Sequence, residues 1–240
     1  MKRLIFAIFL LALPLAAQTE APPHQVQKLF VLKYADADNV YNLLRVFPNT
    51  NIIPNKEMHT LAIATMSNVM PGIEDAINRL DLPSAAPKNI DLTVYLVIGG
   101  EAEGPMPGDL QPVITQLKTA FPFKTYRVLD TLTLRTRTGL RAETQSSGGA
   151  LQVGGGRPQA VNTSFRITSA SLAADGTTVR LDGLSASCRI PYEVGNGINY
   201  RDLGMSTDVD IKEGQKVVVG RLGIEPDQAL VLVLTARVVQ

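Results

Sequence analysis

The hydrophobic and polar positions between Leu29 and Pro83 predict the element order strand, helix, strand, strand, helix. Leu29–Tyr34 has the composition of a half-buried strand. The apolar positions that follow are three or four residues apart, which predicts a helix with one buried face: Ala37, Val40, Leu44 and Phe47. Asp36 stands just before this face, and its carboxylate is expected to cap the helix.

The rest of this segment predicts two short strands and a second helix. The strands are Asn51–Pro54, which ends at the proline, and Thr60–Thr65. Ser67 or Asn68 is expected to cap the second helix, and Pro71 fits its first turn because the N–H groups there lack a helical partner. The apolar face of this helix is made of Val69, Ile73, Ala76, Ile77 and Leu80.

A strand, a helix and a second strand follow. Asn89–Ile98 alternates strongly, and Phe123–Thr138 repeats with period two. Asp109 is expected to cap the helix between them. The apolar positions of that helix are Leu110, Val113, Ile114, Leu117 and Phe121. These lengths predict a βαβ-like unit. Asp130 falls on the apolar side of its second strand, which predicts a bulge or an edge position there.

Beyond Thr138 the pattern is all β. Turns are predicted at Ser146–Gly149 and at Asp175-Gly176, and Pro191–Arg201 is predicted to be a flexible loop. The alternating runs of this part include Val161–Ile167, Thr177–Leu181, Thr207–Ile211, Lys216–Gly220 and Ala229–Val239. The chain is therefore expected to be α+β: a small βαββα domain, a βαβ-like lead-in and a mostly antiparallel β domain.

The first of these domains resembles the periplasmic N-domain repeat of bacterial secretins, the outer-membrane rings of type II secretion and type IV pilus machines. The family pattern is a strand ending in "LKYADA", a helix ending in "LL", then "N-x-L-x-I" and a helix ending in "LD-x-P". The matching residues are Leu32–Ala37, Leu43-Leu44, His59–Ile63 and Leu80–Pro83. His59 stands where the family usually has Asn.

The C-terminal segment resembles the end of the secretin homology domain, "T-x-V-x-x-x-D/E-G-Q-x-V-V-I-G-G-L" followed by "L-V-I-L-L-T-P-x-V-V". The matching residues are Thr207, Val209, Glu213–Gln215, Val217–Gly220, Leu222, Leu230–Thr235 and Val238-Val239. Arg221 replaces the usual second glycine, and Ala236 replaces the usual proline. The "V-P-x-L-G-D-I-P-x-L-G-x-L-F" stretch of channel-forming secretins has no counterpart, since Gly223–Gln228 leads directly into the last strand.

The N-terminal residues have the pattern of a secretory signal, in preference to a buried N-terminal helix. Lys2 and Arg3 precede an apolar core, Leu4–Leu13, that is too short for a stable membrane anchor, and Leu15–Ala17 offers a small-residue cleavage site. We therefore expect an exported protein with this division: residues 1–18 a signal peptide, 19–26 a mobile leader, 27–83 the secretin N-like domain, 84–88 a linker and 89–240 the β-rich secretin-like domain.

Composition argues against nucleic-acid partners. The net charge is +1 and only 5% of the residues are aromatic, whereas nucleic-acid surfaces are strongly basic. The βαββα order is shared with KH-type RNA-binding domains, but the glycine-centred loop that clamps an RNA backbone is absent. An exported protein would also rarely meet RNA.

The sequence predicts no catalytic, cofactor-binding or metal site, and hence no enzyme. His24, His59 and the single cysteine, Cys188, do not make a His/Cys metal site, and Cys188 is expected to be a small buried residue. Ser146-Ser147 has no histidine downstream for a hydrolase triad. Gly154–Gly156 before an arginine lacks the spacing of a phosphate loop and predicts a hairpin tip, and the acidic loop from Glu101 to Asp109 lacks EF-hand order.

The resemblance implies a periplasmic protein that acts through protein–protein contacts as a component or accessory of a type II secretion or type IV pilus complex. Its expected partners are other secretin or secretion and pilus subunits, with a ring of its own copies and outer-membrane association as open points. Two alternatives remain. One is a minimal secretin ring whose membrane hairpins come from Thr138–Arg201. The other is a freestanding periplasmic ligand-binding or adhesion domain, or an unrecognised hydrolase.

Overall fold

The computed structural model describes residues 23–100, 104–153, 157–195, 197–225 and 227–239. The predicted signal peptide and most of the predicted leader lie outside these residues, as do Glu101 and Gly154–Gly156. The chain divides into two compact units, with the boundary between Ala86 and Pro87. The structure is α+β, which confirms the predicted class.

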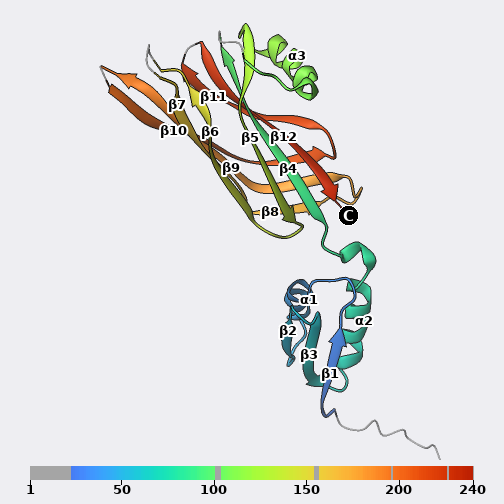
Figure 1. Cartoon of the computed structure of the whole chain (residues 1–240). Helices are drawn as coiled ribbons and strands as arrows, with labels where there is room; N and C mark the ends of the chain where they lie inside the picture. Colours follow the sequence, from blue (N-terminus) through green and yellow to red (C-terminus); the bar gives the residue numbers. More distant parts are fainter. Residues whose placement is uncertain (1–22, 101–103, 154–156, 196, 226, 240) are drawn as a thin grey trace, which may run out of the picture. The chain divides into compact units, whose positions relative to one another are not determined.

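The first unit has the predicted order: β1 Gln25–Val31, α1 Ala37–Leu44, β2 Asn51–Asn55, β3 Thr60–Met66 and α2 Met70–Leu80. Its three strands form an antiparallel sheet with β3 in the middle. The helices cover one face of this sheet (Figure 1) and share a core with it. The largest fully buried side chains of this core are Leu44, Leu61, Ile63 and Ile73. A short 3₁₀ turn, η1 Pro83–Ala85, leads to the second unit.

The two helix caps of the first unit differ from each other. Asp36 caps α1 as predicted, because its Oδ1 accepts the N–H groups of Asp38 and Asn39 at 3.0 and 3.2 Å. The predicted cap of α2 by Ser67 or Asn68 is wrong: the N-cap residue is Val69, without a side-chain hydrogen bond. Ser67 is held elsewhere, since its N–H donates to the carbonyl of His24 and its Oγ accepts the His24 N–H.

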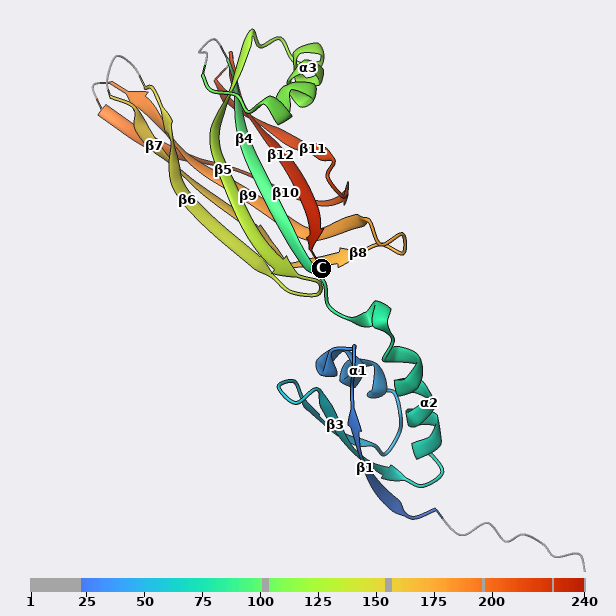
Figure 2. The ribbon, with the colours of Figure 1, turned by 45° about the vertical axis from the view of Figure 1, so that its right-hand side comes forward.

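The second unit consists of two antiparallel sheets that pack face to face (Figure 2) around one apolar core. One sheet has the order β11-β12-β4-β5, with β4 Asn89–Gly100, β5 Thr125–Arg137, β11 Lys216–Glu225 and β12 Gln228–Val239. The other has the order β10-β9-β7-β6, with β6 Ala142–Leu151, β7 Gln159–Ile167, β9 Thr178–Val194 and β10 Gly197–Lys212. β8 Ser169–Leu172 also pairs with β9.

Helix α3 Gln111–Ala120, preceded by the 3₁₀ turn η2 Gly108–Leu110, covers the outer face of the four-stranded sheet near one end (Figure 1). The βαβ-like lead-in is wrong, because β4 and β5 pair directly and antiparallel. Gly100 at the end of β4 pairs with Thr125 at the start of β5, so the connection leaves and returns at the same end of the sheet. The helix is therefore an insertion in a hairpin, whereas a parallel crossover would return the chain to the opposite end.

The predicted cap of α3 by Asp109 is also wrong. The N-cap residue is Leu110, and the Asp109 carboxylate instead accepts hydrogen bonds from the Tyr95 hydroxyl at 3.3 Å and pairs with Lys216 at 3.2 Å. The prediction for Asp130 is confirmed in both respects. β5 is an edge strand of its sheet, and its register with β4 shifts by one residue between Val128 and Asp130.

A predicted turn and a predicted loop lie inside strands, so both predictions are wrong. Ser146–Gly149 belongs to β6, where it forms a register shift against β7 instead of a turn. Most of Pro191–Arg201 belongs to the β9–β10 ladder, in which Pro191 pairs with Tyr200. The neighbouring strand offers a continuous row of hydrogen-bonding partners, and this row outweighs the weak strand propensity of glycine, asparagine and proline. Asp175-Gly176 is a turn as predicted, with the carboxylate of Asp175 accepting the N–H groups of Thr177 and Thr178.

Candidate assembly surfaces

The face of the three-stranded sheet opposite the helices is open and apolar. Leu29, Val31 and Ile53 lie on it with exposed fractions of 62%, 68% and 62%. Side chains of this size are normally buried, and an exposed apolar patch usually marks a contact surface. The face is therefore the first candidate contact surface.

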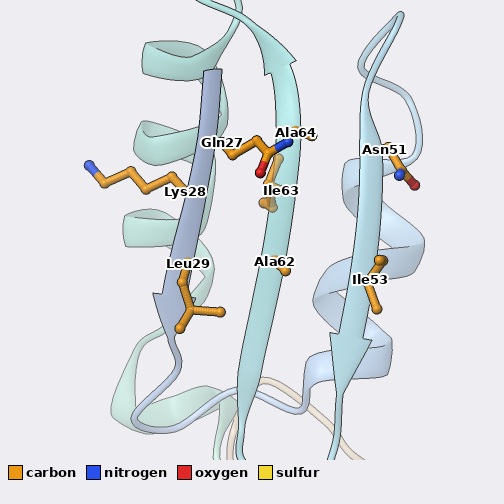
Figure 3. A pocket seen from close by; sticks show the side chains of 8 residues that line it. All are labelled: Gln27, Lys28, Leu29, Asn51, Ile53, Ala62, Ile63 and Ala64. Atoms are coloured by element: carbon orange, nitrogen blue, oxygen red, sulfur yellow. The ribbon is translucent and has the colours of Figure 1, made fainter. Parts of the chain in front are cut away.

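A groove crosses this face (Figure 3), because small residues in the middle strand stand between larger ones on its neighbours. Ala62 on β3 pairs with Leu29 on β1 and with Ile53 on β2. The hollow has a volume of about 330 Å³. Its lining residues are Gln27, Lys28, Leu29, Asn51, Ile53, Ala62, Ile63 and Ala64. Leucine and isoleucine walls with an alanine floor form a trough for an apolar ridge of similar length.

The first unit also carries such a ridge. Val40 and Leu44 on α1 are buried in the core, while Leu43 near the end of α1 and Val46 just after it have exposed fractions of 58% and 80%. Each copy of the unit thus presents both an apolar groove and an apolar ridge. Two surfaces that differ from each other permit head-to-tail contacts between copies.

Asp81, just after α2, is hydrogen-bonded to the segment that follows β1. Its carboxylate accepts the backbone N–H groups of Lys33, Tyr34 and Ala35 at 2.8, 2.7 and 2.9 Å. Burial acts to raise the pKa of Asp81, but these three N–H groups and the charge of Lys33 together hold it below its ordinary value. The segment that follows β1 is thereby fixed to the end of α2.

The five-stranded sheet has two long open edges, β6 and β10. β10 is 16 residues long and carries one lysine, Lys212, at its end; β6 is 10 residues long and has neither lysine nor proline. Monomeric proteins usually protect such edges with lysine, proline or short strands, because free N–H and C=O groups pair readily with another chain. Besides Lys212, the ladders at these edges contain two bulges: one at Ser146–Gly149 in β6, and one at Asp182-Gly183 in β9 opposite Asp208 of β10.

The directions of strands β6 and β10 allow the sheet to continue into a second copy of the chain. Each of β10, β9, β7 and β6 is antiparallel to the next, so that β6 and β10 run in opposite directions. The β10 of a second copy would therefore pair antiparallel with β6, and each copy would keep one free edge for the next. A head-to-tail contact of this kind closes into a ring when the rotation per copy divides a full turn.

The outer face of the five-stranded sheet is polar over most of its length. Ion pairs link neighbouring strands on it: Arg180 with Asp210 at 3.1 Å and Arg166 with Glu143 at 3.2 Å. Apolar exposure on these strands is concentrated at the β9–β10 hairpin end, where Val194, Ile198 and Tyr200 have exposed fractions of 55%, 43% and 36%. This sheet therefore faces water along its length and offers an apolar surface at one end.

Within the described residues, no three His, Cys, Asp or Glu side chains gather as metal ligands. Cys188 is buried as predicted, and burial raises the pKa of its thiol, which disfavours the reactive thiolate. His59 and His24 are both exposed, and Ser146-Ser147 lies on an edge strand. Among the same residues, none of the helices has the length and apolar character needed to cross a membrane.

The sequence matches no family model and no curated protein. The fold, however, matches solved structures. The type II secretin GspD of enteropathogenic Escherichia coli superimposes with a TM-score of 0.56 at 13% identity, covering 89% of this chain and 87% of that one. The secretin domain of InvG from the Salmonella SPI-1 injectisome gives 0.54 at 12% identity, covering 91% and 89%. PilQ of the Vibrio cholerae type IV competence pilus gives 0.53 at 13% identity, covering 90% and 77%.

These matches confirm, at the level of the fold, the resemblance to secretins that the sequence motifs indicate. Two of the departures from the family motifs, Arg221 and Ala236, also fit the structure. Arg221 lies over the rings of Phe121 and Phe123 at 5.4 and 5.2 Å, and so fastens the α3 region to β11. Ala236 lies in the central strand β12 opposite Leu92, where a proline would lack the N–H of the ladder.

Proposed function

We propose that this protein is a non-enzymatic, secretin-like subunit of an envelope secretion or pilus complex, and that its copies assemble side by side into a ring. The observation that carries the proposal is the pair of long, opposite, open edges, β6 and β10, on one antiparallel sheet. The secretin fold supports it, as does the groove and ridge of the first unit. Another matched structure is a complex of an ETEC secretin GspD with the pilotin AspS, which supports protein partners of this class.

The proposed location is the periplasm, with the ring associated with the outer membrane. The N-terminal signal pattern supports export. The apolar end of the β9–β10 hairpin, around Ile198 and Tyr200, is the surface best suited to meet a lipid or membrane interface, because tyrosine and aliphatic side chains favour that region. The polar remainder of the sheet is suited to water or to other subunits.

Cysteine cross-linking tests the ring. In a Cys188→Ala background, which removes the only native thiol, Gln145→Cys on β6 is combined in turn with Asp202→Cys, Gly204→Cys or Ser206→Cys on β10. The three pairs sample three registers of β10 against β6 between neighbouring copies. At least one pair is expected to give a ladder of disulfide-linked oligomers on a non-reducing gel of the isolated envelope.

Each single-cysteine variant is the matched control, since one thiol per chain links at most two copies. If no double variant exceeds the covalent dimer while the protein is exported and folded, pairing of β6 with β10 is ruled out. The edges would then have another role.

A second candidate is an accessory protein that packs against a ring formed by another secretin. The observation that favours it is the missing "V-P-x-L-G-D-I-P-x-L-G-x-L-F" stretch, which channel-forming secretins carry. The mass of the signal-cleaved protein expressed alone separates the two. A large oligomer supports the ring, and a monomer that joins a complex only when a secretin is co-expressed supports the accessory.

A further inference from the structure

Strand β12 loses its neighbour on one side before it ends. β11 pairs with β12 from Gln228 to Thr235, whereas β4 accompanies it as far as Val239. Within the described residues, no strand pairs with residues 236–239 on the side of β11. The four-stranded sheet therefore has a short edge at this end, and β12 itself forms it.

An open edge on β12 would invite pairing with another chain. The strand has the sequence QALVLVLTARVV, which contains one charged residue and no proline. Apolar strands of this kind add further strands readily when their N–H and C=O groups are free. Residues 236–239 are thus the part of β12 that most needs protection.

The turn between β10 and β11 closes this edge. Gly214 donates its N–H to the carbonyl of Ala236 at 2.9 Å, and the carboxylate of Glu213 accepts the N–H of Val238 at 3.0 Å. Alternate residues of a strand direct their N–H and C=O groups to the same edge, and Ala236 and Val238 are two residues apart. A backbone donor and a carboxylate therefore take the place of the missing strand.

The position of Glu213 is fixed from the other sheet. Its own N–H donates to the carbonyl of Thr177 at 2.9 Å, and Thr177 directly precedes β9 of the five-stranded sheet. Gln215 closes the turn by donating its N–H to the carbonyl of Lys212 at 2.9 Å. Because Glu213 is exposed, an approaching strand would meet a carboxylate where it would otherwise find a free N–H.

Glu213, Gly214 and Gln215 are the "D/E-G-Q" part of the motif by which the sequence resembles secretins. We propose that Glu213 prevents a second copy of this chain from pairing with β12, so that strand pairing between copies is confined to β6 and β10. The confinement to β6 and β10 rests on the ring contact under Proposed function. The closure of β12 by Glu213 does not depend on a ring.

Amide exchange on the full, signal-cleaved chain tests the closure. Glu213→Met keeps the length of the side chain but removes its acceptor, whereas Glu213→Gln keeps an uncharged acceptor. Exchange of the peptide that contains Val238, measured by mass spectrometry, is expected to be at least about tenfold faster in Glu213→Met, because a charge-assisted hydrogen bond is lost. Glu213→Gln is expected to show a smaller increase. Glu225→Met is the matched control, since Glu225 is also exposed but lies at the other end of the β11–β12 ladder.

Cross-linking tests the exclusion of a second copy. Val239→Cys in the Cys188→Ala background places the one thiol of the chain beside the closed edge, and a short bismaleimide joins two such thiols only when they lie close together. Combination with Glu213→Met is expected to give several-fold more cross-linked dimer than Glu213 or Glu213→Gln. Ile198→Cys, at the β9–β10 hairpin end, is the control thiol, because general unfolding would increase the dimer at both positions.

Unchanged exchange at Val238, or equal dimer formation in the presence and absence of the Glu213 carboxylate, would overturn the proposal. If Glu213→Met does not fold, Glu213→Gln decides it, since its exchange and its dimer must then both exceed those of the unaltered protein. The β6–β10 cross-links of the proposed ring are recorded separately. Their absence counts against the ring and leaves the closure of β12 to be judged by exchange and by the Val239→Cys dimer.

Discussion

At the scale of single residues, Asp81 connects the two sequence motifs of the first unit. It belongs to the "LD-x-P" motif, and the three N–H groups that it accepts belong to the "LKYADA" motif. We expect Asp81→Asn to lower the stability of the first unit by about 1–2 kcal/mol, because charge-assisted hydrogen bonds to the backbone are lost. Hydrogen exchange of amides in β1 and α2 measures this. Asp75→Asn is the control, since the Asp75–Arg79 pair is largely exposed.

The Asp81 contribution also predicts a pH dependence. The pKa of Asp81 is lowered in the folded protein, so its stabilising effect is complete above the ordinary carboxyl pKa and is lost as pH falls through the lower folded value. The stability difference between the unaltered protein and Asp81→Asn should therefore be constant from pH 7 to about pH 5 and shrink below about pH 4. A difference that grows toward acid pH would contradict this assignment.

Gly183 is the second residue on which the fold depends. Its φ is +59°, and a Cβ there would stand 2.3 Å from the Thr168 Oγ1. It lies at a bulge in β9 opposite Asp208, whose carboxylate accepts the Gly183 N–H at 2.6 Å. We expect Gly183→Ala to destabilise the second unit by about 2–4 kcal/mol, from backbone strain and overpacking together.

Gly176→Ala provides the comparison. Its φ is +69°, but a Cβ would meet nothing within 4 Å. Its cost should be limited to the backbone strain of about 1–2 kcal/mol. Urea unfolding of both variants measures the difference in their free energies of unfolding. Equal losses of stability would show that the contact with Thr168 does not contribute.

At the scale of elements, the open face of the β1-β3-β2 sheet is expected to serve assembly and not folding. Ile53→Glu places a charge in the groove at a side chain that is already 62% exposed. We expect unchanged unfolding but a smaller oligomer, measured by light scattering. Met58→Glu is the control, because Met58 is 66% exposed but lies in the turn between β2 and β3, outside the groove. If both variants lost the oligomer equally, the groove would not be part of the contact between copies.

The β9–β10 hairpin end should govern membrane association. Ile198→Asp is expected to reduce flotation with phospholipid vesicles several-fold, because a charge in place of an exposed apolar side chain opposes transfer to the interface. Leu140→Asp is the control: Leu140 is 46% exposed in the connection between β5 and β6. Vesicle binding that Ile198→Asp leaves unchanged would exclude this hairpin end as the membrane contact.

At the scale of the whole molecule, the secretin fold is retained at 12–14% identity because its requirements are mainly patterns. The two sheets depend on alternating buried positions in β7 and β9, on a nearly continuous apolar β12, and on turns at Gly176 and Gly214. At most of the strand positions, several apolar residues can meet these requirements. Arg221 shows how a departure is accommodated, since a guanidinium over two aromatic rings replaces the small residue of the motif. A fold specified in this way tolerates large changes in sequence.

Local sequence determined the elements that depend on neighbouring residues alone. Asp36 caps α1 because its acceptor reaches N–H groups two and three residues ahead, and the period-two pattern of Val161, Thr163, Phe165 and Ile167 yields four buried side chains. Asp130 marked a bulge at an edge because a carboxylate is unfavourable in a regular row of buried apolar side chains. Ser67 and Asp109 were predicted as caps and are not, because each has a partner distant in sequence: His24, and Tyr95 with Lys216.

The sequence by itself determined the fold class, the order of elements in the first unit and the secretin resemblance, since each rests on periodicity or on motifs along the chain. Only the tertiary structure decided which surfaces stay free. Leu29 and Ile53 are apolar like the core residues beside them, and their exposure depends on both helices packing on the other face of the sheet. Strands β6 and β10 became open edges through the pairing order.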